Sequence, residues 1–192
     1  MAITFVFLTL LMLQSVTFRE SQLRHDRVKA AYEAKAEVVE NYFVRQQLSY
    51  RGFHLFIRGF KRQRELEVWV KEAGKDTYSL LTTYAFCSAS GDLGPKRREG
   101  DLQIPEGIYH LNHFNPKSNF HLSLGINYPN ASDKILSDPE HPGSAIYIHG
   151  NCVTIGCIPI TDDRIKELYI LAVEAKNNGQ QSIPVHIFPA RL

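Results

Sequence analysis

Residues 146–163, which read IYIHGNCVTIGCIPITDD, most constrain what this chain can fold into. Two short apolar runs, 145–148 and 157–160, flank a polar loop that contains glycine. Short apolar runs bounded by turn residues are typical of buried strands. Thr161, followed by two aspartates, has the composition of a helix start, because a hydroxyl and acidic side chains satisfy the helix N-terminus. The sequence therefore predicts two strand ends joined by a loop, and a helix directly after them.

Composition limits the class of protein. The chain has 192 residues, 44% of them hydrophobic and 22% charged, which is enough for one buried core. A net charge of +2 does not favour binding to nucleic acid or to a membrane surface. Three cysteines make no disulfide framework, and the odd number leaves at least one thiol free. Neither a CxxC nor an HExxH motif is present, so we expect neither a metal site nor a cofactor.

The first residues form an almost wholly apolar run, Ile3 to Val16. This run is shorter than the roughly 20 residues of a membrane-spanning helix, but it suits the apolar region of an export signal. No Lys or Arg precedes it and no small-residue cleavage motif follows it, so a buried helix is the alternative. We expect residues 1–19 to be a signal sequence or anchor and the protein to be exported, periplasmic or associated with the cell envelope. Membrane contact would then occur only through this segment, if it is uncleaved.

Two segments have the periodicity of amphipathic helices. Glu20 to Leu48 predicts one long helix within an N-terminal region 20–50, to which we assign packing and no chemistry. The segment after Thr161 predicts a second helix, whose role is to fix the loop before it. The apolar stripes consist of Val28, Ala31, Tyr32, Val38, Val39, Tyr42 and Phe43 in the first helix, and of Ile165, Leu168, Tyr169, Ala172 and Val173 in the second.

The remaining segments alternate between apolar and polar residues and are separated by Gly, Pro and Asn, which indicates strands joined by turns. Successive short strands favour an antiparallel meander and an α+β, β-rich fold. Pro184 suggests either an edge strand or the first residues of a strand. The predicted strands cover 53–58, 66–71, 78–87, 108–113, 120–126 and 183–188.

The segment 88–107 is rich in Gly, Pro and charge, and a loop of this length in a compact domain is often functional. Three consecutive basic residues lie within it. One interpretation is a solvated surface, and the other is contact with an anionic group of a substrate. From the residues alone the two interpretations are balanced. The three residues are Lys96, Arg97 and Arg98.

His149 and Cys157 are candidates for nucleophilic catalysis. A thiol attacks as the thiolate, and a neighbouring imidazole can take its proton and later act as a general acid. The backbone N–H groups of Gly156 and Cys157 could hold a tetrahedral oxyanion. The carbonyl of Gly150 could accept from the imidazole and fix its tautomer.

The other two cysteines leave alternatives open. Cys152 competes for the nucleophile's role, because it lies three residues from His149 in the same loop. Cys87 is expected to be a small buried hydrophobic residue rather than a functional thiol, and the sequence leaves open whether Cys87 and Cys152 pair. A zinc set of His141, His149, Cys152 and Cys157 is a further alternative, although zinc ligands usually come in closer pairs.

The pattern His149-Gly150, a short loop, then Thr154 to Cys157 resembles the active-site signature of YkuD-type L,D-transpeptidase catalytic domains. The segment from Gly94 to Tyr109 is similar to a second motif of that family, and the form of both motifs, with 127–129 ahead of the first, is most similar to the YafK-like branch. The resemblance spans about Phe53 to Phe188. Two separated motifs in the same order make it specific.

The resemblance implies a catalytic domain over residues 51–192, a β-sandwich or barrel with a helix before it and a helix after the active-site loop. It implies an acyltransferase outside the cytoplasm that acts on peptidoglycan stem peptides at the L-centre of diaminopimelate. Cys157 would be the nucleophile, His149 the proton acceptor and donor, and Gly150 the orienting carbonyl. An amine or water would resolve the acyl-enzyme, and an amidase that releases a lipoprotein from peptidoglycan is a variant. No cofactor is implied.

The chain departs from the family pattern at two places. Ile155 stands where many members have a histidine that is not the general base. Residues 158–160 lack the arginine that many members carry soon after the cysteine, so Lys96 or Arg97 would have to contact the substrate carboxylate instead. We also assign Tyr128 to the substrate side. The competing functions are a non-catalytic peptidoglycan-binding module and a metal-dependent peptidase.

Overall fold

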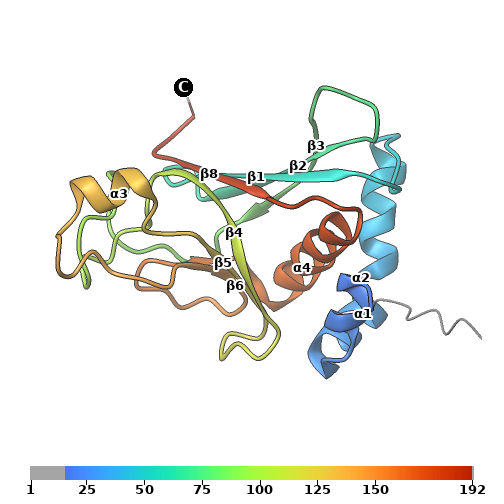
Figure 1. Ribbon diagram of the computed structural model, residues 1–192, viewed down its shortest axis with the longest axis horizontal. Coiled ribbons are helices and arrows are strands. Elements are labelled where there is room, and N and C mark those ends of the chain that lie inside the picture. The colour runs from blue at the N-terminus through green and yellow to red at the C-terminus, as the bar shows by residue number, and fades with distance from the viewer. Residues whose placement is uncertain (1–15, 192) are drawn as a thin grey trace, which may run out of the picture.

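The computed structural model of the protein describes residues 16–191 and has four helices and eight strands within that range (Figure 1). The predicted α+β, β-rich class is confirmed. The elements in chain order are α1 (Phe18–Leu23), α2 (Asp26–Arg45), β1 (His54–Phe60), β2 (Glu65–Lys71), β3 (Ser79–Ala85), β4 (Gly107–Asn115), β5 (Ser123–Ile126), α3 (Ala131–Leu136), β6 (Tyr147–His149), β7 (Ile158–Pro159), α4 (Thr161–Asn177) and β8 (Pro184–Phe188).

The strands form one curled sheet in the order β3-β2-β1-β8-β4-β5-β6-β7. The predicted antiparallel meander holds for β1 to β3, and β4 to β6 continue in the same way. It fails where β8 enters between β1 and β4, because β8 runs parallel to β1. Pro184 is the first residue of this central strand, where a missing N–H does least harm, and does not mark an edge.

The curl brings the two ends of the sheet together. The N–H of Cys87, two residues past β3, donates to the carbonyl of Pro159 in β7 at 3.0 Å. β3 and β7 are the outermost strands in the sheet order. One hydrogen bond therefore links the two edges, and the sheet approaches the sandwich or barrel that the sequence predicted.

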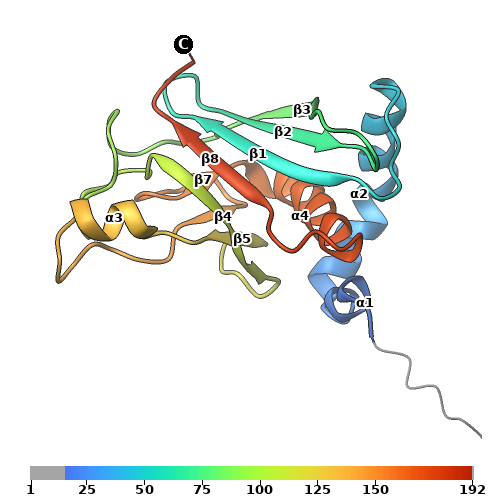
Figure 2. The same ribbon diagram turned by 45° about the horizontal axis from the view of Figure 1, so that its top comes forward.

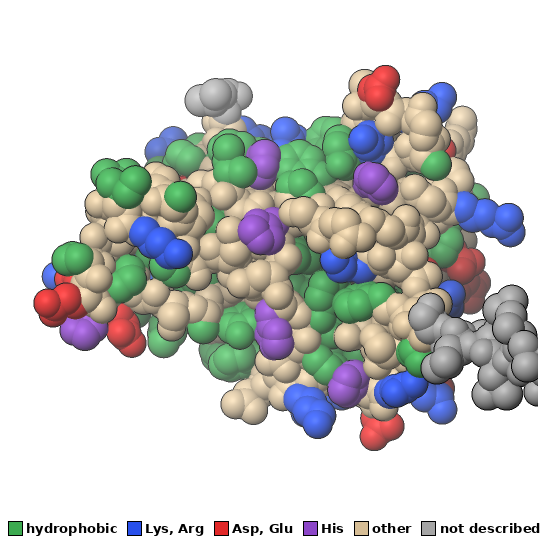
Figure 3. Space-filling model, in the orientation of Figure 1, with side chains coloured by type: hydrophobic (Ala, Val, Ile, Leu, Met, Phe, Trp, Pro, Cys, Tyr) green, Lys and Arg blue, Asp and Glu red, His purple; other side chains and the backbone are tan. Residues whose placement is uncertain are grey.

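Helix α4 is the central helix of the core. It lies under the sheet, with α2 beyond it (Figure 2), and ten of its residues are buried. Its two buried glutamates are satisfied, because Glu167 accepts from the Tyr42 hydroxyl at 2.8 Å and Glu174 accepts from the Tyr32 hydroxyl at 2.7 Å. Both tyrosines belong to α2, so these bonds attach α2 to α4. On the face that Figure 3 shows, charged side chains of both signs are scattered, as the small net charge leads one to expect.

Three local predictions need correction or comment. The single helix predicted over 20–48 is two helices, which meet at Arg24 and His25. Helix α3 lies in a segment for which neither a helix nor a strand was predicted, although Asn130 and Asp133 form a reciprocal capping box at its start. The signal or anchor predicted for 1–19 falls almost wholly outside the described residues. Within 16–191, none of the helices combines the length and the apolar character that crossing a membrane requires.

Candidate active site

Strand pairing brings His149 and Cys157 to one cavity. β6 and β7 are parallel neighbours, with Ile148 opposite Ile158 and His149 opposite Pro159. His149 ends β6 and Cys157 precedes β7, so both lie at the loop that joins these strands. Their side chains line a cavity of about 420 Å³. The two residues that the sequence analysis selected as candidates thus line the same cavity.

His149 is fixed and almost completely buried, with 1% of its surface exposed. Its Nδ1 lies 2.5 Å from the carbonyl oxygen of Gly150. A carbonyl can only accept, so Nδ1 carries the proton and the neutral ring keeps the lone pair of Nε2. The Phe120 ring covers the imidazole at 4.6 Å between centroids. Burial lowers the pKa of His149, and the bond to Gly150 opposes this only in part.

Cys157 is the free cysteine of the chain. Its sulfur accepts from the N–H of Tyr147 at 3.4 Å and lies 3.9 Å from the carbonyl of Ala145. Burial raises the pKa of the thiol, and the Tyr147 N–H and the charge of Lys96 act in the opposite direction. The pair is therefore a neutral thiol and a neutral imidazole near pH 7, so the thiol loses its proton as it attacks.

Gly150 is held by the start of α4, a contact that the sequence did not reveal. A Cβ at residue 150 would lie 2.5 Å from Asp162 Oδ1 and 2.8 Å from the carbonyl of Phe120. The same Asp162 oxygen accepts the N–H of Asn151 at 2.7 Å. The acidic helix start predicted from the sequence thus has a second role, because it fixes the residue that orients His149.

The two predicted oxyanion donors are not equivalent. The N–H of Gly156 donates to the Thr154 hydroxyl at 3.1 Å, and that hydroxyl donates to the carbonyl of Cys157 at 2.8 Å. Gly156 has φ +135°, a conformation that favours glycine. The Thr154 turn therefore shapes the backbone beside the thiol and engages the Gly156 N–H. The other predicted oxyanion donor, the Cys157 N–H, belongs to the same residue as the thiol.

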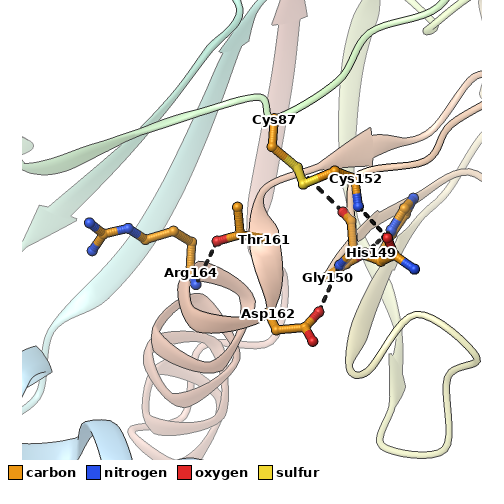
Figure 4. The surroundings of a disulfide bond; sticks show 8 residues. Cys87, His149, Gly150, Cys152, Thr161, Asp162 and Arg164 are labelled. Carbon is orange, nitrogen blue, oxygen red and sulfur yellow. Dashed lines mark hydrogen bonds between the residues drawn. A yellow bond between two sulfur atoms is a disulfide. The ribbon is translucent and has the colours of Figure 1, made fainter.

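Cys87 and Cys152 form a disulfide, with 5.3 Å between their Cα atoms (Figure 4). Cys87 is therefore a half-buried disulfide cysteine and not the small buried hydrophobic residue that was expected, and Cys152 is no competitor for the nucleophile's role while it is bonded. For the same reason the zinc set that included Cys152 is not assembled. The sequence could not show this bond, because the two cysteines are 65 residues apart.

The basic loop is partly inside the protein. Lys96 is 4% exposed and lines the cavity, and its Nζ donates to Asp101 at 2.6 Å and to the carbonyl of Arg98 at 2.9 Å. Burial alone would raise the pKa of Asp101, but hydrogen bonds from Lys96 and from three backbone N–H groups lower it to about 2. Lys96 is thus a buried cation with a paired carboxylate, and not a solvated side chain.

The other two residues assigned to the substrate side lie elsewhere. Arg97 and Tyr128 are not among the residues that line the cavity of Cys157. The backbone N–H of Arg97 donates to Asp101 at 2.8 Å. The hydroxyl of Tyr128 donates to the carbonyl of Pro142 at 2.7 Å, which supports the segment that leads into β6. Of the three predicted contacts, the cavity includes only Lys96.

A curled β-sheet that holds a histidine and a cysteine at one loop defines the class of protein. Residues 61–187 match the YkuD family, the L,D-transpeptidase catalytic domain. The match covers more than half of the chain, which therefore belongs to this family.

Among relatives, the chain is 38% identical over 150 residues to the putative L,D-transpeptidase YafK of Escherichia coli (strain K12). The alignment covers 77% of this chain and 58% of that protein, so the chain spans little more than half of the relative's length. The fold is similar to that of the helical cell shape determining protein Pgp2 of Campylobacter jejuni, with a TM-score of 0.56 and 20% identity over 80% of this chain and 56% of that one. The fold is also similar to that of Bd1075 of Bdellovibrio bacteriovorus, with a TM-score of 0.50 and 29% identity over 71% of this chain and 48% of that one.

Proposed function

We propose that the protein is a cysteine acyltransferase of the L,D-transpeptidase type, which acts on peptidoglycan stem peptides at the L-centre of diaminopimelate. One observation carries the proposal. The free thiol of Cys157 shares a cavity with His149, whose Nδ1 is bonded to Gly150 and whose Nε2 is therefore a proton acceptor. Membership of the family supplies the substrate class. The export signal predicted for the N-terminus is consistent with a substrate in the cell envelope.

The first half of the reaction forms the acyl-enzyme. The Cys157 sulfur attacks the carbonyl carbon of the L-centre while its proton passes to Nε2 of His149. The N–H of Cys157 stabilises the oxyanion, and the N–H of Gly156 joins it if the Thr154 turn adjusts. The carbon–nitrogen bond then breaks, His149 gives its proton to the leaving amine, and a thioester remains on Cys157.

The second half regenerates the thiol. An amine or water attacks the thioester, His149 takes a proton from the attacking group, and the sulfur leaves as the thiol. An amine yields a new cross-link, whereas water yields a free carboxylate. If the leaving amine in the first half belongs to a peptidoglycan-linked lipoprotein, the same chemistry is that of an amidase.

Lys96 is the residue we assign to the substrate's carboxylate. Two of its three N–H groups are used by Asp101 and by the carbonyl of Arg98, which leaves one for a ligand in the cavity. This assignment takes the place of the family arginine that residues 158–160 lack.

The test is incubation of the purified protein with a panel of muropeptides, with and without a lipoprotein-linked substrate, followed by mass spectrometry. A carbapenem serves as a second acyl donor, because opening of its lactam leaves a mass adduct on the sulfur. We expect a cross-linked or hydrolysed product and an adduct on Cys157, both absent from Cys157→Ala. A product from the Cys157→Ala variant would contradict the proposal.

The same experiment distinguishes the competing functions. A non-catalytic module would bind peptidoglycan and yield no product from any muropeptide. A metal-dependent peptidase would lose its activity in strong chelator, whereas the proposed thiol enzyme would keep it.

A further inference from the structure

The loop between the two active-site residues is exposed in its middle. Val153 and Ile155 are 53% and 78% exposed. One end is held where the Asn151 N–H meets Asp162, and the other where the Thr154 hydroxyl bridges to the carbonyl of Cys157. Between these ends lies Cys152, whose disulfide to Cys87 attaches the loop covalently to another part of the chain (Figure 4).

Cys87 lies two residues past the end of β3, in a segment that backbone hydrogen bonds hold against its neighbours. The N–H of Phe86, the residue before it, donates to the carbonyl of Arg64 at 2.7 Å, and the Phe86 side chain is 5% exposed. The N–H of Cys87 itself donates to Pro159 in β7. Residue 87 thus contacts both sides of the segment that contains Cys157: Cys152 before it through sulfur, and Pro159 after it through the backbone.

The backbone between these two anchors is the part on which the proposed chemistry depends. It contains the Thr154 turn, the Gly156 and Cys157 N–H groups, and the thiol itself. A displacement of about 1 Å in a reacting group can cost about a hundredfold in rate. An exposed loop held only at its ends would permit displacements of that size.

We infer that Cys87 and Cys152 are positioning residues, and that their disulfide holds the loop 151–156 in the geometry in which Cys157 is acylated. The effect on acylation rests on the proposed function. The effect of the disulfide on the position of the thiol does not. The bond has a second consequence. While Cys152 is oxidised, Cys157 is the one thiol of the chain that can accept an acyl group.

The test compares the wild-type protein with the double variant Cys87→Ser/Cys152→Ser. Each has Cys157 as its single free thiol, so every label reports on the same sulfur. Acylation by a carbapenem needs the positioned loop, whereas alkylation by iodoacetamide needs only an accessible thiolate. We expect acylation to fall by roughly tenfold to a hundredfold, as displacement of the loop predicts, while alkylation at neutral pH rises because the loop no longer buries the sulfur.

The pH profile of alkylation gives a readout that loss of stability alone would not move. The titratable groups that line the cavity with the thiol are His149, Tyr147, Glu99 and Lys96, which is paired with Asp101, and all are the same in both proteins. The pH profile of alkylation should therefore shift to lower pH in the double variant, because the Cys157 thiol is less buried there. Tyr42→Phe, which removes a hydroxyl from the interface with α4, is the control and should leave both rates unchanged.

Opposite changes in the two rates support the inference, and equal alkylation profiles with equal acylation rates would overturn it. If the double variant does not fold, wild-type protein reduced with dithiothreitol, which becomes a cyclic disulfide, provides the comparison. Acylation should then fall on reduction and return after oxidation by glutathione disulfide; a rate unaffected by the cycle counts against positioning. If the wild-type protein is not acylated at all, the proposed function fails, and the alkylation profiles alone decide the inference.

Discussion

At the scale of single residues, the site depends on two opposed pKa shifts. Burial lowers the pKa of His149 and raises that of Cys157. Both groups are then neutral near pH 7, and a preformed thiolate–imidazolium pair is disfavoured. The thiol is therefore protected from unspecific electrophiles until a substrate allows the proton to move to His149.

The pH dependence follows from these shifts. Acylation needs neutral His149, so its rate should rise through the pKa of His149, below the ordinary value of 6.5, and be constant at neutral pH. Alkylation by iodoacetamide needs the thiolate, so its rate should keep rising with pH through the neutral range and reach its midpoint only above the ordinary thiol pKa of 9.0. Rates of both reactions measured from pH 4 to pH 10 check this. Two coincident profiles would contradict the neutral pair.

Gly150→Ala should disrupt the site without a change of charge. The new Cβ would lie 2.5 Å from Asp162 and 2.8 Å from the backbone of Phe120, so residue 150 and its carbonyl must move. We expect a loss of about 1–3 kcal/mol in unfolding free energy, as for other overpacked sites, and a large loss of acylation because His149 loses its orienting partner. Gly59→Ala is the matched control, since its Cβ would meet Phe86 at an ordinary 3.6 Å. Equal acylation by the two variants would contradict the assigned role.

At the scale of elements, the first turn of α4 acts on the loop before it. Asp162→Ala removes the acceptor for the Asn151 N–H. We expect an acylation rate lower by about tenfold, in line with a small displacement of reacting groups. Asp163→Ala is the control, because the neighbouring carboxylate pairs with Lys35 and Lys166 and not with the loop. An equal effect of both changes on the rate would indicate a general effect of helix charge.

Local patterns predicted the elements well, and their arrangement less well. The apolar runs before His149 and after Cys157 predicted two strands, which are neighbours in the sheet and place both candidate residues at one loop. By contrast, the burial of Lys96 depends on Asp101 turning back toward it, and the central place of β8 depends on pairing with strands far away in the chain. Helix α3 was missed although its capping residues, Asn130 and Asp133, were visible, because the segment lacks an apolar stripe.

At the scale of the whole molecule, the disulfide joins parts of the chain that are 65 residues apart. A cross-link across a loop of this length should stabilise the fold by about 4 kcal/mol through the entropy of the unfolded chain. Cys87→Ser/Cys152→Ser should lower the unfolding free energy by that amount, measured by urea titration. A free energy unchanged within error would contradict the expected net stabilisation by the bond.

The sheet order has a consequence for the order of assembly. β8 is the last strand in the chain, yet it lies between β1 and β4 at the centre of the sheet. Strand pairing therefore joins β1 to β4 through residues 184–188, whereas the outer edges of the two halves meet separately at Cys87. Contacts between residues so distant in sequence form late and slowly. A nascent chain that lacks β8 already contains Cys157 with β6 and β7, but β1 and β4 are not yet joined into one sheet.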